Sequence, residues 1–312
     1  TCEKPDYLIV SYHGGFSEDL IMGTIYQERI GENQANEIIE TVEGIDLLIT
    51  GHQHLYFNER INNTLVVQPT SHGKGFMEVQ VDFNHQHKQS TAIFHPINTS
   101  NLSYRNEIEK WLDKEIAYVP TDYTYSGLLT SRLTSHPYIQ LLHDMQLTAT
   151  NAQISVCDLL YLENGGFSGT VTNRDLLKNA SREHTLNVIP LTGYEIKLLM
   201  EQSAAVFSIN KDREIDFSTN VYPEKPQPYQ YDFWGGLNYI IDVSHPVGKR
   251  IKEVSFNGEP VELTRDYKVV LNSYRLTGVD FPLLKNRPIL YKTEVTVPFL
   301  LKEYLQNKPL LK

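Results

Sequence analysis

Ile49-Thr50-Gly51-His52-Gln53-His54 places two histidines two residues apart, directly after the apolar run Asp46-Leu47-Leu48-Ile49. The run predicts a buried strand that ends at a turn at Gly51, so both imidazoles leave from its carboxyl end. Tyr7–Ser11 has the same form, an apolar run followed by His13 and two glycines. Open α/β sheets bind ligands at the carboxyl ends of their strands. If the two strands are neighbours, the three histidines should converge.

These histidines are candidate metal ligands. Three imidazoles at strand ends suit zinc, manganese or iron, and the glycines after His13 would let the backbone approach a bound anion. A histidine pair on a turn is also common in exposed loops, and that interpretation stays open here. His72, in Ser71-His72-Gly73, follows a further predicted strand. It could approach a phosphate, although a plain turn histidine is the more common case.

The composition is that of a globular protein with room for two domains. The 312 residues are 40% apolar and 21% charged, and the net charge is −10. No basic residues cluster, so a nucleic-acid polymer is not an expected partner. Cys2 and Cys157 are the only cysteines, which excludes a disulfide framework and a thiolate metal cage. No apolar run approaches the roughly 18 residues of a membrane span.

The start of the chain leads to a separate expectation. The sequence opens at Thr1, almost directly before the predicted strand at Tyr7–Ser11. Mature domains seldom begin so abruptly. We therefore expect that a segment N-terminal to Thr1 has been removed or lies outside this sequence.

The N-terminal part predicts a strand–helix–strand unit. Apolar residues at helical spacing predict a helix over Glu32–Val42, with Gly44 near its C-cap. The unit should be parallel and right-handed. Three extended pieces follow, which we interpret as antiparallel strands closing the first domain: Thr64–Val67, Met77–Val81 and Thr91–Phe94.

From residue 103 onward helices and strands mix. A helix over Ser103–Val119, capped by Ser103 and stopped by Pro120, leads to a linker at Tyr118–Ser126. Thr192-Gly193-Tyr194-Glu195 is a capping box that begins a helix reaching Phe207. The other predicted elements are helices over Pro137–Met145 and Val295–Asn307, a loop over Pro223–Tyr231, and strands over Leu237–Val243, Lys252–Phe256 and Tyr267–Leu271.

A series of motifs runs in one order along nearly the whole chain. In the first part they include Ser11-Tyr12-His13-Gly14-Gly15-Phe16, Gly31-Glu32-Asn33 and Gly51-His52-Gln53-His54. In the second part they include Val171-Thr172-Asn173-Arg174-Asp175, Tyr231-Asp232-Phe233-Trp234-Gly235-Gly236 and Leu271-Asn272-Ser273-Tyr274-Arg275. With these motifs the chain resembles the 5′-nucleotidase family, and most closely its 2′,3′-cyclic-nucleotide 2′-phosphodiesterase/3′-nucleotidase type.

The resemblance implies an α/β fold in three parts. Residues 1–100 would be the C-terminal half of a calcineurin-like metallophosphoesterase domain, and so part of a four-layer sandwich. Residues 101–120 would be a connecting helix and linker. Residues 121–312 would be an α+β nucleotide-binding domain of the 5′-nucleotidase C-terminal type.

The resemblance also implies a two-metal mechanism. The family holds two divalent ions (Mn, Zn, Mg or Fe); its matching positions assign His13 and His52 to one ion and His54 to the other. Two such ions can activate a water and clamp the phosphoryl oxygens. No catalytic residue beyond these ligands is identified.

The matching positions of the second part imply a nucleotide site. Tyr274 matches an aromatic residue that stacks on the base, and Asp280 matches a ribose-binding aspartate. Asn164, Gly165 and Gly166 lie where the family has a glycine-rich substrate loop, although turns of this composition are common.

The chain departs from the family pattern in two places. The first half of the catalytic domain supplies further metal ligands, and none of them precedes His13, so this chain alone is expected to bind metal incompletely. Either another piece of polypeptide completes the domain, or the chain is an inactive remnant. Arg182-Glu183-His184 replaces an aromatic-x-Asn motif at the base site. The Arg182 guanidinium can stack on a base, or this loop no longer binds one.

The leading hypothesis is therefore a phosphoric ester hydrolase. It would act as a nucleotidase or 2′,3′-cyclic nucleotide phosphodiesterase on nucleoside phosphates, together with the missing half of its catalytic domain. The resemblance places it outside the cytoplasm, as a secreted, periplasmic or cell-wall-associated protein. The alternatives are a nucleotide-binding module without hydrolysis, and a structural module in which His52 and His54 are remnants.

Overall fold

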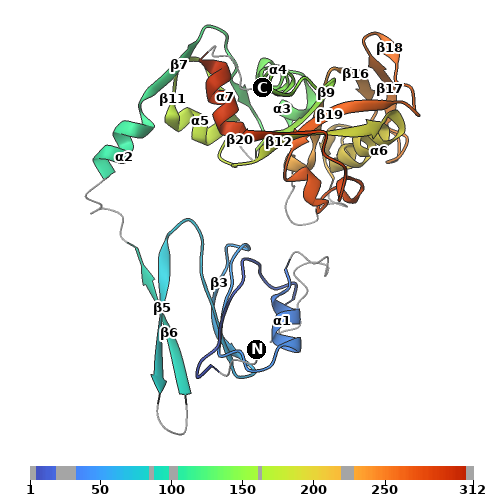
Figure 1. Cartoon of the computed structure of the whole chain (residues 1–312). Coiled ribbons are helices and arrows are strands. Elements are labelled where there is room, and N and C mark those ends of the chain that lie inside the picture. The colour runs from blue at the N-terminus through green and yellow to red at the C-terminus, as the bar shows by residue number, and fades with distance from the viewer. Residues whose placement is uncertain are drawn as a thin grey trace. The chain divides into compact units, whose positions relative to one another are not determined.

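The computed structural model describes residues 5–18, 33–83, 88–97, 105–160, 164–218 and 228–306. The chain divides into two compact units, Thr1–Ser103 and Tyr104–Lys312, whose elements are labelled in Figure 1. Each unit is described separately below. The three-part domain assignment stays a prediction.

The first unit is built on a four-stranded sheet with the order β1-β2-β4-β3. β1 (Ile9–Ser11) and β2 (Leu47–Ile49) are parallel, and α1 (Ala35–Thr41) connects them. Ala35 and Ile39 of this helix pack on Leu48 and Val66 of the sheet. The predicted strand–helix–strand unit is confirmed, with Glu32 outside the described residues.

The predicted strand at Thr64–Val67 is confirmed, and it is antiparallel to one of its neighbours and parallel to the other. β4 (Thr64–Pro69) runs parallel to β2, because β3 (Tyr56–Ile61), which the sequence analysis missed, forms an antiparallel hairpin with β4. This hairpin turns the chain around, so β4 points the same way as β2. In the sequence of β3, polar and apolar residues alternate too weakly to predict a strand.

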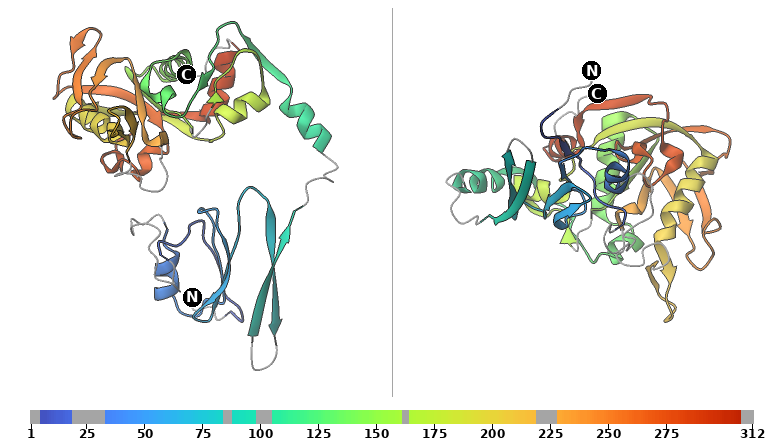
Figure 2. Two further views of the ribbon diagram at one scale, coloured as in Figure 1. Left: turned by 180° about the vertical axis from the view of Figure 1, so that it is seen from behind. Right: turned by 90° about the horizontal axis from the view of Figure 1, so that it is seen from below.

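The remaining strands of the first unit form a separate hairpin. β5 (Gly75–Phe83) and β6 (Lys88–Pro96) pair antiparallel, from Gly75 opposite Pro96 to Phe83 opposite Lys88. Figure 2 shows these two strands as a long ribbon beside the other strands of the unit. The predicted strands at Met77–Val81 and Thr91–Phe94 are confirmed as parts of this hairpin.

The second unit is built on a five-stranded sheet with the order β15-β9-β19-β12-β20. Its strands are β9 (Ile154–Asp158), β12 (Thr185–Thr192), β15 (Asp232–Gly235), β19 (Asp266–Asn272) and β20 (Tyr291–Thr296). β9 and β19 are parallel, and the other neighbours are antiparallel. The carboxyl ends of β9 and β19 therefore lie at one edge, where the start of β12 also lies.

Helices cover both faces of this sheet. Leu186 and Val188 of β12 pack with residues of α4 (Pro137–Thr150) and α7 (Val297–Leu305), while Ile189 and Leu191 pack with residues of α6 (Gly193–Ser203). This alternation is the two-residue period of a strand that is buried on both faces. The sheet is thus the middle layer of the unit.

The predicted helix over Ser103–Val119 is wrong in its second half. α2 (Arg105–Leu112) ends early, and β7 (Glu115–Val119) pairs with β11 (Gly169–Thr172) instead. Ile108 and Trp111 of α2 are about half exposed, and α2 buries none of its residues. The β-branched and aromatic residues of β7 gain more from pairing than from extending the helix. The proposed capping residue Ser103 lies outside the described part of the chain.

The other predictions differ from the structure mainly at their ends. Thr192 caps α6 in a two-sided capping box with Glu195, as predicted, but α6 ends at Ser203. Phe207 belongs to the next strand. The predicted linker contains residues of two strands, and the described part of the 223–231 loop is a short 3-10 helix. The remaining elements are β8 (Tyr125–Ser126), α3 (Thr130–Leu133), β10 (Asn164–Gly165), α5 (Asn173–Asn179), η2 (Ala204–Val206), β13 (Phe207–Ile209), β14 (Ile215–Phe217), η3 (Pro228–Gln230), β16 (Leu237–Ile241), β17 (Ile251–Phe256), β18 (Glu259–Pro260), η4 (Arg275–Thr277) and η5 (Pro282–Leu284).

Across the described residues, every helix is too short or too polar to cross a lipid bilayer.

Candidate functional site

The predicted metal ligands lie at one edge of the first sheet. β1, β2 and β4 are parallel neighbours, so the loops that follow them leave from the same edge. The backbone N–H of Gly51 donates to the carbonyl of Gly14 at 3.1 Å, and the N–H of Thr70 donates to the carbonyl of Leu55 at 3.1 Å. These two bonds join the loop after β2 to the loops after β1 and β4.

His13 and His52 form one pair at this edge. Their ring centroids are 5.7 Å apart, and the rings meet edge to face at 74°. Gly51 makes room for this contact, because a Cβ atom there would lie 3.1 Å from His13 Nδ1. A larger residue at position 51 would push the His13 ring away from His52.

His54 pairs with His72 rather than with His13. The centroids of these two rings are 5.2 Å apart, with an angle of 69° between the ring planes. The Oγ atom of Ser71 lies 2.7 Å from His72 Nδ1, which orients the His72 ring. His72 thus belongs to the same edge as the three predicted histidines, although the sequence favoured a plain turn residue there.

The backbone of these loops is strained. His52, His54, Thr70 and His72 have φ angles of 69°, 60°, 70° and 60°. A non-glycine residue in this left-handed region is uncommon, and a β-branched one such as Thr70 is a genuine outlier. Each such residue costs about 1–3 kcal/mol and persists only where its surroundings hold it. The strain therefore concentrates in the segments that carry the histidines.

Gln53, between two of the histidines, anchors the loop. Its Oε1 accepts the N–H of Phe16 and its Nε2 donates to the carbonyl of Phe16, both at 2.8 Å. A Cβ atom on Gly15 would overlap the Gln53 side chain. The space next to Gly15, which we expected to admit an anion, is thus filled by Gln53 in this structure.

In each histidine pair, the two ring centroids are about as far apart as those of two imidazoles bound to one metal ion. With a metal–nitrogen distance of about 2.0–2.1 Å, and about 1.1 Å from that nitrogen to the ring centre, two imidazoles on one tetrahedral ion have centroids roughly 5 Å apart. The observed 5.2 and 5.7 Å are close to this value. Within the described ranges, however, no three His, Cys, Asp or Glu residues come together to hold an ion. The donors fit in chemistry and spacing, but not in number.

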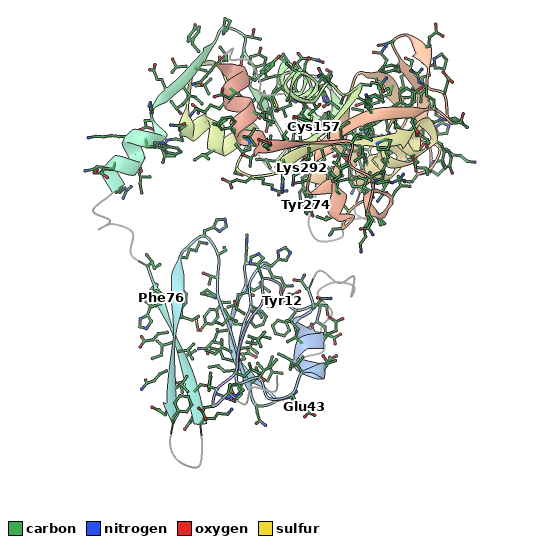
Figure 3. All side chains as sticks on the ribbon, viewed as in Figure 1. Tyr12, Glu43, Phe76, Cys157, Tyr274 and Lys292 are labelled. Atoms are coloured by element: carbon green, nitrogen blue, oxygen red, sulfur yellow. The ribbon has the colours of Figure 1, made fainter. Side chains whose placement is uncertain are left out.

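The predicted base site lies in the second unit, at the edge where β9 and β19 end. A pocket of about 80 Å³ there is lined by Arg182, His184 and Tyr274, among other residues. Tyr274 follows β19 and is labelled in Figure 3. The rings of His184 and Tyr274 are stacked, with centroids 5.8 Å apart and 29° between their planes. His184, which the sequence analysis did not select, thus faces the predicted stacking residue.

Arg182 has a different partner from the one that a base-stacking role requires. Its guanidinium carbon lies 5.6 Å from the ring centroid of Tyr229. Burial and, to a smaller extent, the Arg182 guanidinium lower the pKa of His184, so the imidazole facing Tyr274 is neutral at pH 7. A neutral ring suits stacking on an uncharged base.

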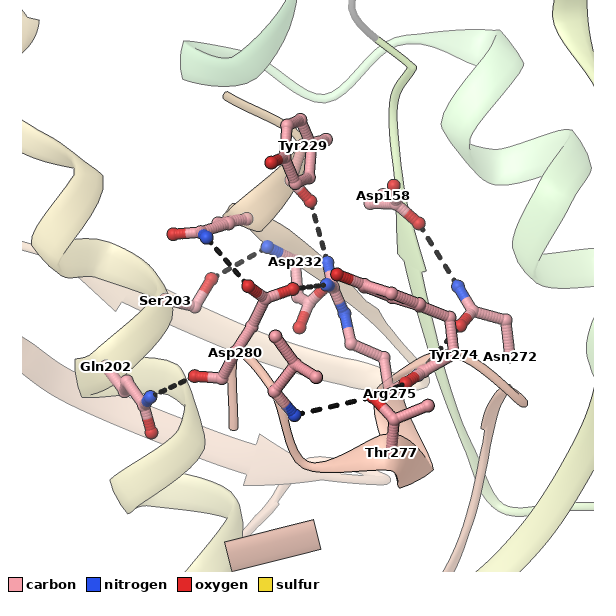
Figure 4. A network of polar contacts seen from close by, with 12 residues as sticks. Asp158, Gln202, Ser203, Tyr229, Asp232, Asn272, Tyr274, Arg275, Thr277 and Asp280 are labelled. Carbon is pink, nitrogen blue, oxygen red and sulfur yellow. Dashed lines mark hydrogen bonds and ion pairs between the residues drawn. The ribbon is translucent and has the colours of Figure 1, made fainter. Parts of the chain in front are cut away.

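Behind this pocket, a buried charge network holds the segment that carries Tyr274 and Asp280 (Figure 4). Arg275, whose side chain is 2% exposed, donates to Asp232 Oδ1 at 2.7 and 3.1 Å, to Asp280 Oδ2 at 3.1 Å and to the carbonyl of Tyr229 at 2.7 Å. Gln230 Nε2 donates to Asp280 Oδ1 at 2.8 Å. The carboxylate predicted to bind ribose is thus already engaged inside the protein.

The network contains more acid than base. Burial raises the pKa of Asp232 to about 7, and the nearby carboxylates of Asp158 and Asp280 act in the same direction, while Arg275 opposes them. One guanidinium cannot fully neutralise several carboxylates, so one acid keeps its proton more readily.

The glycine-rich loop lies outside the pocket and is hydrogen-bonded to a residue that lines it. Asn179, which lines the pocket, accepts the N–H of Gly166 at 2.6 Å through its Oδ1. Asn164 and Gly165 form β10, and a Cβ atom on Gly165 would overlap the Tyr125 ring. The structure thus brings this loop close to the pocket but not into its lining.

A larger cavity of about 520 Å³ lies elsewhere in the second unit, where the predicted sites do not reach. Phe233, Trp234 and His143 are among its lining residues. Trp234 Nε1 is buried and has no hydrogen-bond partner among the described residues, and burial lowers the pKa of His143 to about 4. His143 Nδ1 lies 3.0 Å from Ser155 Oγ, so this imidazole is a neutral part of the core.

Comparison with known proteins agrees with the fold. Residues 115–286 match the family model described as 5′-nucleotidase, C-terminal domain. The trifunctional nucleotide phosphoesterase protein YfkN of Bacillus subtilis is 25% identical over 97% of this chain and 24% of its own length. A 2′,3′-cyclic-nucleotide 2′-phosphodiesterase/3′-nucleotidase of Salmonella typhimurium is 32% identical over 36% of this chain and 19% of its own length.

Solved structures show the same likeness. A Staphylococcus aureus protein assigned as a 5′-nucleotidase superposes with a TM-score of 0.77 at 29% identity, over 98% of this chain and 62% of that one. A 5′-nucleotidase precursor from Thermus thermophilus shares the fold, with a TM-score of 0.53 at 18% identity, over 86% of this chain and 57% of that one. The predicted α/β fold class is confirmed. This chain spans about a quarter or less of the length of the curated relatives.

Proposed function

The chain belongs to the family of 5′-nucleotidase C-terminal domains, and on this premise we propose that it is part of a metal-dependent nucleotide phosphohydrolase. The proposed substrates are nucleoside 2′,3′-cyclic phosphates or nucleoside monophosphates, in line with the names of its relatives. The proposed location is outside the cytoplasm, as a secreted, periplasmic or cell-wall-associated protein.

The observation that carries the proposal is the group of paired imidazoles at the carboxyl edge of β1, β2 and β4. His13 and His52 would hold one divalent ion, and His54 would hold a second. When bound, such ions lower the pKa of a water and neutralise charge on the phosphoryl oxygens. Exposed imidazoles suit this role, because an ion can reach them from solvent.

The protein's own residues have a positioning role in this proposal. Gln53 clamps the loop to Phe16 through two hydrogen bonds, so His52 and His54 leave the chain on either side of a fixed point. The strained backbone holds their rings in place before an ion arrives, which reduces the ordering that binding would otherwise require.

In the second unit, we propose that Tyr274 stacks on the base. A base inserted between Tyr274 and His184 needs roughly 7 Å between the two rings, twice a van der Waals contact of about 3.5 Å. The observed separation of 5.8 Å means that the rings would move apart on binding, or that the base stacks on one of them. We propose that Asp280, which Arg275 and Gln230 hold in place, meets the ribose.

A further polypeptide segment is part of the proposal. The described residues offer the histidines only in pairs, and a two-metal centre needs more ligands than these. We propose that the first half of a metallophosphoesterase domain supplies them.

The test is to combine the 312-residue chain with such a half and to assay phosphate release with Mn²⁺. We expect release from a nucleoside 2′,3′-cyclic phosphate or monophosphate, and its loss in His52→Asn. Gln140→Ala, a change of an exposed helix residue in the second unit, is the control and should leave the rate unchanged. No phosphate release with any divalent ion would refute the hydrolase proposal.

A second candidate is a nucleotide-binding module without hydrolysis, favoured by the small number of candidate ligands. Calorimetry with adenosine and AMP separates the two. Stacking of one base on an aromatic ring is worth about 1–3 kcal/mol, so Tyr274→Ala should weaken binding by roughly tenfold or more. Tyr194→Ala, at an exposed tyrosine on α6, is the matched control. Binding in the absence of any phosphate release would favour the module, and absence of heat in both variants and parent would exclude it.

A further inference from the structure

His72 meets His54 through the topology of the first sheet. β2 and β4 are parallel neighbours, so the loops at 50–55 and 70–74 leave from the same edge. Two hydrogen bonds to the Leu55 carbonyl, from the Thr70 N–H at 3.1 Å and from Gln68 Nε2 at 2.9 Å, hold the loops together. The backbone positions that bring the two rings together are therefore held by hydrogen bonds.

The geometry of this pair matches shared coordination. The His54 and His72 centroids, at 5.2 Å, are closer to the separation of about 5 Å expected for two imidazoles on one tetrahedral ion than those of His13 and His52, at 5.7 Å. The 69° between the ring planes keeps the rings from stacking face to face.

One ring nitrogen of His72 already has a hydrogen-bond partner in the neighbouring Ser71. Ser71 Oγ lies 2.7 Å from Nδ1, and metal-bound histidines usually use their second nitrogen in a hydrogen bond of this kind. This arrangement fixes the ring and leaves Nε2 for coordination. His72 is also exposed, so an ion can reach it from solvent.

The strained backbone at Thr70 and His72 is a further sign that the His72 side chain has a fixed position. Thr70 and His72 both adopt left-handed φ angles, of 70° and 60°. Strain of this kind clusters at ligand-binding segments, where it fixes a side chain in advance.

We propose that His72 is a metal ligand and that it binds the same divalent ion as His54. The edge then offers one imidazole pair to each of two ions, His13 with His52 and His54 with His72. Imidazole nitrogens favour ions such as Zn²⁺, Co²⁺ or Mn²⁺. This inference rests on the proposed function, since it adds a ligand to the ion assigned there to His54.

The test is calorimetric titration with Zn²⁺, at neutral pH, of the full 312-residue chain combined with the half-domain that the proposed function adds to it. The variants are His72→Asn, His54→Asn and His52→Asn, because asparagine tolerates the left-handed backbone at all three positions and removes the imidazole. His245→Asn, at an exposed histidine in the second unit, is the matched control.

We expect two Zn²⁺ ions per chain, with His72→Asn and His54→Asn weakening the same one. The loss should be about tenfold or more, since even the outer partners of metal ligands are worth about 10–100-fold in affinity. The double variant His54→Asn/His72→Asn should abolish that ion and leave the other unchanged. A Cu²⁺ electron paramagnetic resonance spectrum should lose one coordinating nitrogen in His72→Asn.

The outcomes separate this inference from the proposed function. If His54→Asn and His52→Asn weaken Zn²⁺ binding and His72→Asn does not, His72 is no ligand, while the proposed metal centre stands. If none of the three variants differs from the control, or the parent binds no Zn²⁺, the metal assignment and this inference both fail.

Discussion

The histidine edge of the first unit and the Arg275 network of the second unit hold their polar groups in opposite ways. At the histidine edge the rings are exposed and the backbone is strained. In the Arg275 network the side chains are buried, and each charge has hydrogen bonds within the protein. In the proposed metal centre, exposure lets an ion reach the imidazoles from solvent, whereas the network holds the segment that carries Tyr274 and Asp280. The proposed binding groups and the supporting groups thus carry different physical signatures.

The sharpest test of this contrast is to remove the central charge of the network. Arg275→Met removes the buried guanidinium that donates to both Asp232 and Asp280, and breaking a buried pair in this way costs about 3–5 kcal/mol. We expect the free energy of unfolding of the second unit to fall by that amount in urea denaturation. Arg174→Met is the control, since Arg174 binds Glu109 and Asp113 at the surface and such pairs are worth about 0–1 kcal/mol. Equal losses in both variants would contradict the role assigned to the network.

A second test uses pH. The pKa of Asp232 is raised from 3.8 to about 7, so the folded chain binds a proton that the unfolded chain releases between these values. The stabilisation from this group is complete below about pH 4 and is lost as the pH rises toward 7. Urea denaturation of Asp232→Asn from pH 4 to 7 should therefore show a flatter pH dependence than the parent chain. An unchanged slope would show that Asp232 is ionised throughout this range in the folded state.

The smallest expected effect tests the strain at the histidine edge. Thr70→Gly replaces a β-branched residue at a φ of 70° by one that adopts this angle freely, so we expect the first unit to gain about 1 kcal/mol. Thr91→Gly in β6 should instead lose about 1 kcal/mol, since that residue is in ordinary strand conformation. The measurement is urea denaturation of each variant. A loss of stability in Thr70→Gly would mean that the Thr70 side chain contributes more than its backbone strain costs.

Local sequence predicted the elements whose signals lie within a few residues. The capping box at Thr192 and Glu195 and the apolar run at Leu47–Ile49 both formed as expected. Prediction failed where pairing with a distant segment of the chain decides the secondary structure. Glu115–Val119 carried a helical pattern but became a strand because Gly169–Thr172 lies beside it. β3 stayed hidden because its pairing with β4 shows only weakly in its own residues.

The same distinction applies to the site. Motif order alone pointed to His13, His52, His54, Tyr274 and Asp280, which remain predictions as functional residues. Only the fold joined His54 to His72 and His184 to Tyr274, and only the fold gave Arg182 the Tyr229 ring as its neighbour. Asp280 could not be recognised from sequence as a partner of Arg275 and Gln230, because those contacts depend on how the chain folds back on itself.

The sequence by itself determined the family, the fold class and the chemical types available, because these depend on which residues occur and in what order. The tertiary structure decided which imidazoles form pairs. Spacing in the sequence does not decide such a pair: His54 meets His72, eighteen positions further along the chain, because their loops follow two parallel strands. Ligand geometry depends on distances of a few ångströms between loops, and strand pairing sets those distances.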